Sequence, residues 1–147
     1  MRSAECGVKK RPECGARDAD YRQPKRTMSY ENLKRRTKKF GLDVIRLFEG
    51  LPKDEVSRIL GRQLLRSGAA VGANYRAACR AKSSADFISK LGNVEEEADE
   101  SGYWLEMLVD AEKVKPTAAA PFIQEASELT AIAVSSINTA RESGCHP

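Results

Sequence analysis

The sequence predicts an all-α protein, an antiparallel up-down-up-down four-helix bundle. Apolar residues recur at alternating spacings of three and four in four successive stretches, which is the pattern of amphipathic helices. Short links that contain Pro, Gly or Ser separate these stretches, and no stretch alternates in the manner of a strand. The helices are expected at about 29–49, 53–81, 84–113 and 117–142, so that residues 29–147 form the bundle.

Residues 1–28 precede the bundle and are expected to be a disordered basic arm, because they are polar, interrupted by Gly and Pro, and without periodicity. Residues 1–39 hold 13 Lys or Arg against 5 Asp or Glu, whereas residues 40–147 hold 12 against 16. The net charge of +4 therefore comes from the N-terminal portion. Such an arm suits a nucleic acid or an acidic partner, or is simply solvated. Met28 is an alternative start, which would make the arm an extension of the gene model.

The first helix, at about 29–49, follows Ser29, which can cap it. Its apolar positions form a heptad seam, and Leu51-Pro52 is expected to end it because a proline disfavours helical geometry in the preceding residue. The seam consists of Leu33, Thr37, Phe40, Val44, Leu47 and Leu51. Another face of this helix is basic and carries Lys34, Arg35, Lys38 and Lys39.

The second helix, at about 53–81, opens with a proline and two acidic residues, which suit a first turn. It has two unlike stripes on roughly opposite sides. The packing stripe consists of Val56, Leu60, Leu64, Ser67, Val71, Asn74 and Ala78. The other stripe carries five arginines: Arg58, Arg62, Arg66, Arg76 and Arg80.

Gly61, Gly68 and Gly72 lie together on a flank between these two stripes. Each costs a helix interior about 1 kcal/mol relative to alanine, so three of them favour close approach of another backbone over tolerated surface glycines. Gln63 and Asn74 lie on or beside the packing stripe. A buried amide there fixes helix register, or alternatively lines a polar pocket.

The third helix is expected to start after a cap at Ser83-Ser84, and it keeps the cleanest heptad of the chain. Its seam is Phe87, Leu91, Val94, Ala98, Ser101, Leu105 and Leu108. Its outer side is acidic, with Glu96, Asp99, Glu100, Glu106 and Asp110. The fourth helix starts at about Thr117 or Pro121 and ends at Ser143-Gly144. Its inner stripe is Phe122, Ala126, Leu129, Ala133, Ile137 and Ala140.

No constellation of residues indicates catalysis, so we expect no enzyme, no metal and no cofactor. The four cysteines, Cys6, Cys14, Cys79 and Cys145, form no CxxC pair, and the one histidine is His146. A di-iron bundle would need histidines on its helices. Scattered thiols favour a reducing cytoplasm. The chain has no apolar run that could span a membrane and no secretory signal.

The arginine stripe has two functional readings beside solvated charge. In the first, the guanidinium groups contact the phosphates of RNA or DNA. In the second, the stripe pairs with the acidic third helix of a neighbouring subunit, and heterologous pairing of that kind closes rings. A small-molecule or metal enzyme is a third hypothesis, which would need an occupied internal pocket.

The stretch from Phe40 to about Leu108 resembles the four-helix-bundle proteins encoded within intervening sequences of bacterial 23S ribosomal RNA genes. The resemblance rests on three motifs: Leu51-Pro52-x-x-Glu55; Gln63-Leu64-x-Arg66-Ser67 through Ala73-Asn74; and Arg80-x-Lys82-Ser83-x-x-Asp86-Phe87, followed by an acidic helix. After the asparagine this chain has Tyr75-Arg76-Ala77-Ala78 instead of an Ile-Ala-Glu-Gly-like segment, which makes the face more basic.

The resemblance implies a homo-oligomeric ring, a pentamer, and no catalytic residues. It also implies kinship with the accessory variability determinant of diversity-generating retroelements, a basic ring that binds nucleic acid and a reverse transcriptase. The predicted nucleic-acid contacts are Arg58, Arg62, Arg66, Arg76, Arg80, Lys34, Arg35, Lys38 and Lys39. The predicted oligomer interface comprises Gly61, Gly68, Gly72, Glu96, Asp99 and Glu100.

Overall fold

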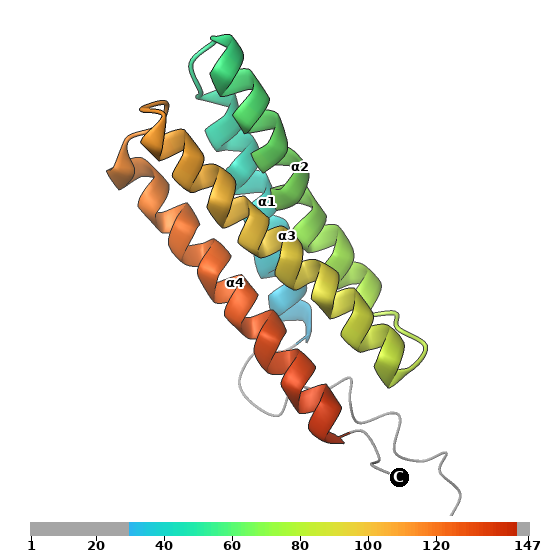
Figure 1. Ribbon diagram of the computed structural model, residues 1–147. Helices are drawn as coiled ribbons and strands as arrows, with labels where there is room; N and C mark the ends of the chain where they lie inside the picture. The colour runs from blue at the N-terminus through green and yellow to red at the C-terminus, as the bar shows by residue number, and fades with distance from the viewer. Residues whose placement is uncertain (1–29, 144–147) are drawn as a thin grey trace, which may run out of the picture.

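The computed structural model describes residues 30–143, and these residues form four helices and no strand (Figure 1). The prediction of an all-α fold with four helices is confirmed. The helices are α1 (Tyr30–Glu49), α2 (Glu55–Ala78), α3 (Ser84–Asp110) and α4 (Pro116–Ser143). The arm 1–28, Met28, Ser29, and the cysteines Cys6, Cys14 and Cys145 with His146 lie outside the described residues.

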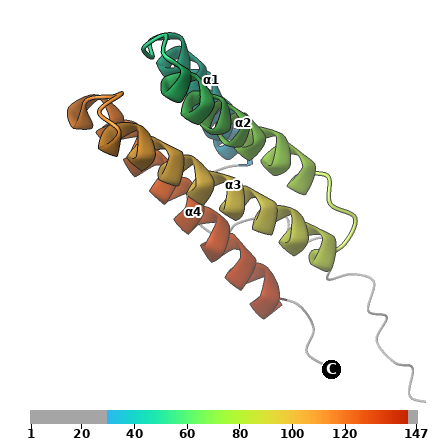
Figure 2. The ribbon, with the colours of Figure 1, turned by 45° about the horizontal axis from the view of Figure 1, so that its top comes forward.

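The four helices lie alongside one another in chain order (Figures 1 and 2). The α1–α2 and α3–α4 links lie at one end of the molecule, and the α2–α3 link lies at the other. An ion pair of 3.2 Å between Lys113 Nζ and Asp54 Oδ1 joins the α3–α4 link to the α1–α2 link. The α1–α2, α2–α3 and α3–α4 pairs make extensive contacts, whereas α1 and α4 meet only sparsely.

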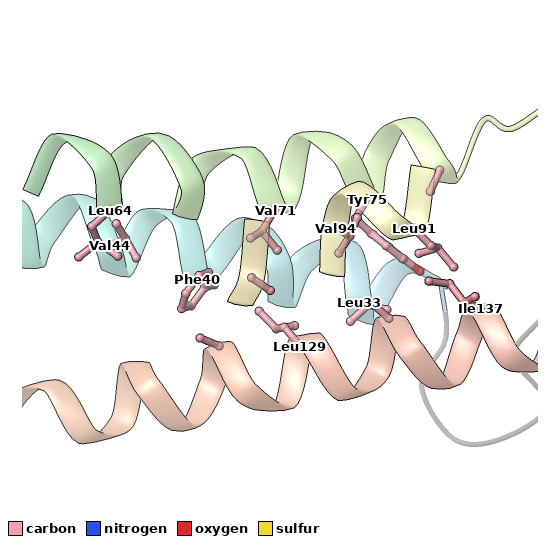
Figure 3. Packing of buried hydrophobic residues seen from close by; sticks show 14 of the residues in the cluster. Leu33, Phe40, Val44, Leu64, Val71, Tyr75, Leu91, Val94, Leu129 and Ile137 are labelled. Atoms are coloured by element: carbon pink, nitrogen blue, oxygen red, sulfur yellow. The ribbon is translucent and has the colours of Figure 1, made fainter. Parts of the chain in front are cut away.

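A single apolar core runs along the axis between the helices (Figure 3). All seven predicted seam positions of α3 are buried, from Phe87 to Leu108. Leu64, Leu105 and Leu108 have no exposed surface at all. At mid-length, Ser101 Oγ donates a hydrogen bond of 2.9 Å to Ser67 Oγ, and both serines are fully buried. This contact places Ser67 of α2 directly opposite Ser101 of α3, and each hydroxyl also has a carbonyl acceptor in its own helix, Leu64 O at 3.2 Å and Glu97 O at 2.8 Å.

The helix ends follow local hydrogen bonding. Asp54 caps α2, since its carboxylate accepts from the backbone N–H (3.1 Å) and the hydroxyl (2.7 Å) of Ser57. The Ser57 hydroxyl in particular lowers the pKa of Asp54 to about 2. Ser83 caps α3 as expected, accepting from the N–H of Asp86. α3 ends at Asp110, before the expected 113, because Glu112 adopts a left-handed conformation (φ 57°).

The packing face of α2 differs from the predicted stripe. Val56 is 48% exposed, and Leu60 and Asn74 are only partly buried. The buried positions instead include Ser57, Gly61, Gly68 and Tyr75. The contact face is therefore rotated toward the glycine flank, because α2 packs against α1 through those glycines. Gln63, half-buried, accepts a long hydrogen bond of 3.4 Å from Arg66 Nε.

The glycine flank meets α1 of the same chain. A Cβ built on Gly72 would lie 3.3 Å from the carbonyl oxygen of Thr37, and one built on Gly68 would lie 3.0 Å from both methyl carbons of Val44. The close approach of another backbone that the three glycines indicated is thus provided by α1. Gly61 and Gly68 are buried in this contact, so their surfaces are covered within the subunit.

We expect Gly68→Ala to destabilise the protein even though alanine is the better helix former. The added methyl group would press on Val44, whose branched side chain has little freedom to move, and overpacking of this kind costs about 1–3 kcal/mol. The matched control is Gly92→Ala in α3, where an added Cβ meets nothing within 4 Å and propensity should give up to about 1 kcal/mol of stabilisation. Chemical denaturation measures both; a stabilising Gly68→Ala would contradict the tight α1–α2 contact.

Candidate nucleic-acid interface

Five of the nine predicted basic contacts gather where α1 begins and α2 ends. This is the same end as the α2–α3 link (Figure 1). We call this group the basic end, and it comprises Lys34, Arg35, Lys38, Arg76 and Arg80. The backbone of Lys38 lies beside Gly72, and the rings of Tyr30 and Tyr75 lie 6.1 Å apart, centroid to centroid. The last turn of α2 therefore lies alongside the first turns of α1.

Most side chains of the basic end are open to solvent. Arg35, Lys38, Arg76 and Arg80 are exposed, and none of the four makes an ion pair with another residue of the described chain. Lys34 pairs with Glu31 at 2.9 Å. That hydrogen bond raises the pKa of Lys34, while the positive charge of Arg76 opposes the shift. Two helices thus present unneutralised positive charge side by side.

Three other predicted contacts are already paired within the subunit. Arg58 Nη2 lies 2.9 Å from Glu55 Oε2 on α2, and Lys39 pairs with Asp43 one turn further along α1. Arg66 reaches across to α3, where it pairs with Glu100 and, at 3.7 Å, with Glu97. The predicted arginine face and the predicted acidic interface therefore meet inside one chain at Arg66.

Glu100 is held by a second donor as well. Trp104 Nε1 donates to Glu100 Oε1 at 2.9 Å, and this bond, together with Arg66, lowers the pKa of the carboxyl group. The remaining arginine, Arg62, is exposed and makes no ion pair within residues 30–143. On α3, Glu96, Asp99, Glu106 and Asp110 are exposed and likewise make no ion pair in that range.

A tyrosine–cysteine pair lies beneath the basic end. Tyr75 is 4% exposed, and burial raises the pKa of its hydroxyl group. Cys79 is half-buried, and burial raises the pKa of its thiol as well. A thiol with a raised pKa stays protonated at neutral pH and is a poor nucleophile. Within the described part of the chain, no three His, Cys, Asp or Glu residues are close enough together to hold a metal ion.

A groove of about 330 Å³ lies between α1 and α4, where these helices meet sparsely. Phe40 and Phe122 line it, and its rim is formed by charged groups that already pair with each other. Arg36 Nε lies 2.6 Å from Glu125 Oε1, and the same guanidinium group also reaches Glu128. These ion pairs hold α1 against α4. None of the four helices is long and apolar enough to cross a membrane.

Sequence reasoning missed the exposed apolar residues. Leu42, Ile45, Val56, Ile59 and Tyr103 are between 37% and 53% exposed. Periodicity assigned Val56 to the core, and it gave no role to the other four. The sequence distinguished these four residues only as large apolar side chains that lie outside every predicted seam.

The fold and this surface define a four-helix protein with a basic end. A scan of family models matches residues 32–135 to the 23S rRNA-intervening sequence proteins. The chain therefore belongs to this family, which confirms the resemblance found in its motifs. It is also similar to a crystal structure from Bacteroides thetaiotaomicron, a protein of unknown function from the S23 ribosomal protein family. That similarity has a TM-score of 0.70 and 32% identity, over 76% of this chain and 99% of the other. No curated protein matches significantly.

Proposed function

We propose that the protein is a non-enzymatic accessory factor that binds RNA or DNA by contacting phosphates with its basic end. The observation that carries the proposal is a group of four exposed cations at the start of α1 and the end of α2, Arg35, Lys38, Arg76 and Arg80, which make no ion pair with another described residue. Guanidinium groups bind phosphate oxygens well, and positive charge that no carboxylate neutralises is free to do so. The basic residues of segment 1–28 precede α1 in the sequence.

The proposal includes the assembly. We infer an antiparallel up-down-up-down bundle as the subunit of a homo-oligomeric ring, and the family resemblance implies a pentamer. The alternation of the links between the two ends of the molecule supports the antiparallel order. A ring would place several basic ends on one rim, which multiplies weak phosphate contacts. The cysteine usage of the sequence favours the cytoplasm as the location.

The test is a binding titration of the full chain with single-stranded RNA and with duplex DNA, by fluorescence anisotropy at several salt concentrations. If four to five phosphates are neutralised per subunit, the logarithm of the binding constant should fall with the logarithm of salt with a slope of about −4 for duplex DNA. A shallow slope, or no binding at low salt, would refute the phosphate-contact proposal. A comparison of the two curves shows which nucleic acid the protein prefers.

The second candidate is a protein-interaction scaffold, for example for a reverse transcriptase, in which the arginine stripe pairs with the acidic α3 of a neighbouring subunit. It is favoured by the exposed Arg62 on α2 and the exposed carboxylates on α3, none of which makes an ion pair within residues 30–143. Arg66 already makes such a pair within the subunit. In this case Arg62→Glu should break the assembly, as measured by light scattering, and leave an intact fold. An assembly of unchanged mass would argue against it.

A further inference from the structure

Exposed apolar residues concentrate at the end of the molecule opposite the basic end. Of the six large apolar side chains that are exposed among residues 30–143, five lie on the helix halves near the α1–α2 and α3–α4 links. Only Val134, on α4, does not. Exposed apolar residues gathered at one end suggest interaction sites in a protein that otherwise exposes charge. Most of the exposed large apolar side chains of the described residues and the basic end thus lie at opposite ends of the molecule.

The first surface is aromatic and lies between α2 and α3. It comprises Val56, Ile59, Tyr103, Trp104 and Met107, which we call the aromatic patch. The contacts Ser67–Ser101 and Asp54–Lys113 fix the alignment of α2 with α3, and this alignment places Ile59 beside the turn that contains Met107. The rings of Tyr103 and Trp104 pack edge to face, with centroids 4.9 Å apart. Aromatic residues and methionine are the types enriched at the centres of protein interfaces.

The second surface is aliphatic and lies on α1. Leu42 and Ile45 are three residues apart, so they share a face of the helix, and they are 45% and 37% exposed. We call them the aliphatic pair. Lys38 lies one turn before Leu42 on the same face, and it is exposed without an ion-pair partner in the described chain. The exposed arginine row of α2 separates the two surfaces. The aliphatic pair lies on the side of this row that faces α1, and the aromatic patch lies on the side that faces α3.

The two surfaces have opposite charge surroundings. α3 carries eight acidic side chains and one lysine. By contrast, α1 carries six basic and three acidic side chains, and α2 carries four basic side chains and one acidic side chain. Glu106 and Asp110 follow Tyr103 and Met107 by three residues on α3, and neither carboxylate makes an ion pair within residues 30–143. Lys38 lies one helical turn before Leu42 on α1, and it likewise makes no ion pair in that range. Opposite charge around two apolar centres is the complementarity expected of surfaces that meet.

We propose that the aromatic patch of one subunit docks on the aliphatic pair of the next, so that two unlike faces of the same chain form a head-to-tail contact. The occupant is a second copy because a single chain carries both complementary surfaces. Contacts between unlike faces repeat from subunit to subunit and close into a ring. The inference rests on the homo-oligomer in the proposed function and specifies its contact faces. Of the basic end, Lys38 borders this contact, whereas Arg35, Arg76 and Arg80 remain available for nucleic acid.

The test uses two double variants of the full chain, studied by sedimentation velocity. Ile59→Asp with Tyr103→Asp removes the aromatic patch, and Leu42→Asp with Ile45→Asp removes the aliphatic pair. Each variant alone should sediment as a monomer, with a dissociation constant raised by roughly 30-fold or more. An equimolar mixture of the two should form one-to-one heterodimers, because each variant retains the surface that the other lacks.

This mixing experiment separates the proposal from its competitors. If the aromatic patch met itself across a two-fold axis, the aliphatic variant would assemble normally and the mixture would contain no heterodimer. Either result, or a wild-type protein that stays monomeric, would overturn the head-to-tail contact. Val134→Asp is the control and should assemble like wild type. Circular dichroism checks that each variant folds. If an aspartate variant does not fold, the test is repeated with the milder variants Tyr103→Ala and Leu42→Ser.

Two further measurements test the subunit contact and nucleic-acid binding independently of each other. Trp104 is the only tryptophan of the chain, so its emission reports directly on the aromatic patch. Dilution of the wild-type protein should shift this emission to longer wavelength as subunits separate, and the absence of any shift would contradict the docking site. Nucleic-acid binding is measured separately: an intact assembly that binds no nucleic acid would refute the basic end alone, and a monomer that binds would refute only the subunit contact.

Discussion

Replacing Leu105 by alanine is expected to lower the free energy of unfolding by about 3–4 kcal/mol. Leu105 lies in the middle of the α3 seam and has no exposed surface. α3 also packs extensively against two neighbours, α2 and α4. The cavity left by the missing atoms would therefore be enclosed by two helix pairs, and neither can move inward without breaking its other contacts. Urea denaturation followed by circular dichroism measures the change.

The control for this prediction is Val134→Ala on the outer side of α4, where the side chain is 37% exposed. This change should cost well under 1 kcal/mol, because much of the valine is in water in the folded state too. If Leu105→Ala cost no more than Val134→Ala, the assignment of the α3 seam to the centre of the core would be wrong.

Helix α3 shows how much of such a fold is predictable from sequence. Its seam alternates spacings of three and four without interruption, and every predicted seam position, including Ser101, is buried. The pattern suffices because α3 buries a face that is continuously apolar or small. In α1 the same reasoning placed Leu33, Thr37, Phe40 and Val44 correctly. There the small Thr37 satisfies its own hydroxyl by donating to the carbonyl oxygen of Leu33 at 2.9 Å.

Helix α2 shows why the same reasoning fails elsewhere. A glycine has no side chain, so it adds nothing to an apolar stripe even when it lies at the centre of a helix contact. Gly61 and Gly68 nevertheless define where α1 lies, and the buried face is rotated toward them. Val56 is left outside as a result, and Tyr75 is brought inside against Tyr30. The sequence indicated that the glycine flank is a contact. It did not indicate that the whole buried face of α2 is rotated toward these glycines.

The candidate site was predictable only as a set of residues on one face. Spacing places five arginines along α2, but it does not show which of them a carboxylate neutralises. Arg66 and Glu100 are 34 residues apart and meet only because of the alignment of α2 with α3. By contrast, the pair of Arg58 with Glu55 has a helical spacing of three and is visible in the sequence. Within residues 30–143, the structure thus separates the predicted cations that pair with a carboxylate from those that do not, and four of the latter, Arg35, Lys38, Arg76 and Arg80, lie at the basic end.

Reversing two charges at that end, with Arg76→Glu and Arg80→Glu, is expected to weaken nucleic-acid binding by about 100-fold or more at low salt. Charge-assisted hydrogen bonds contribute about 1.5–3 kcal/mol each, so the loss of two accounts for this factor before the added repulsion is considered. The slope of the logarithm of binding against the logarithm of salt should also become shallower by about 2. Fluorescence anisotropy with the preferred nucleic acid measures both quantities.

The control for this prediction carries the same change in net charge at the opposite end of the molecule. Arg46→Glu with Lys115→Glu alters two exposed side chains near the α1–α2 and α3–α4 links. Its effect should stay within about 5-fold, because salt screens charges that lie more than about 10 Å from the bound phosphates. Equal losses for the two double variants would mean that binding follows only the net charge of the protein. A loss confined to Arg76 and Arg80 would instead localise binding to the basic end, where α1 begins and α2 ends.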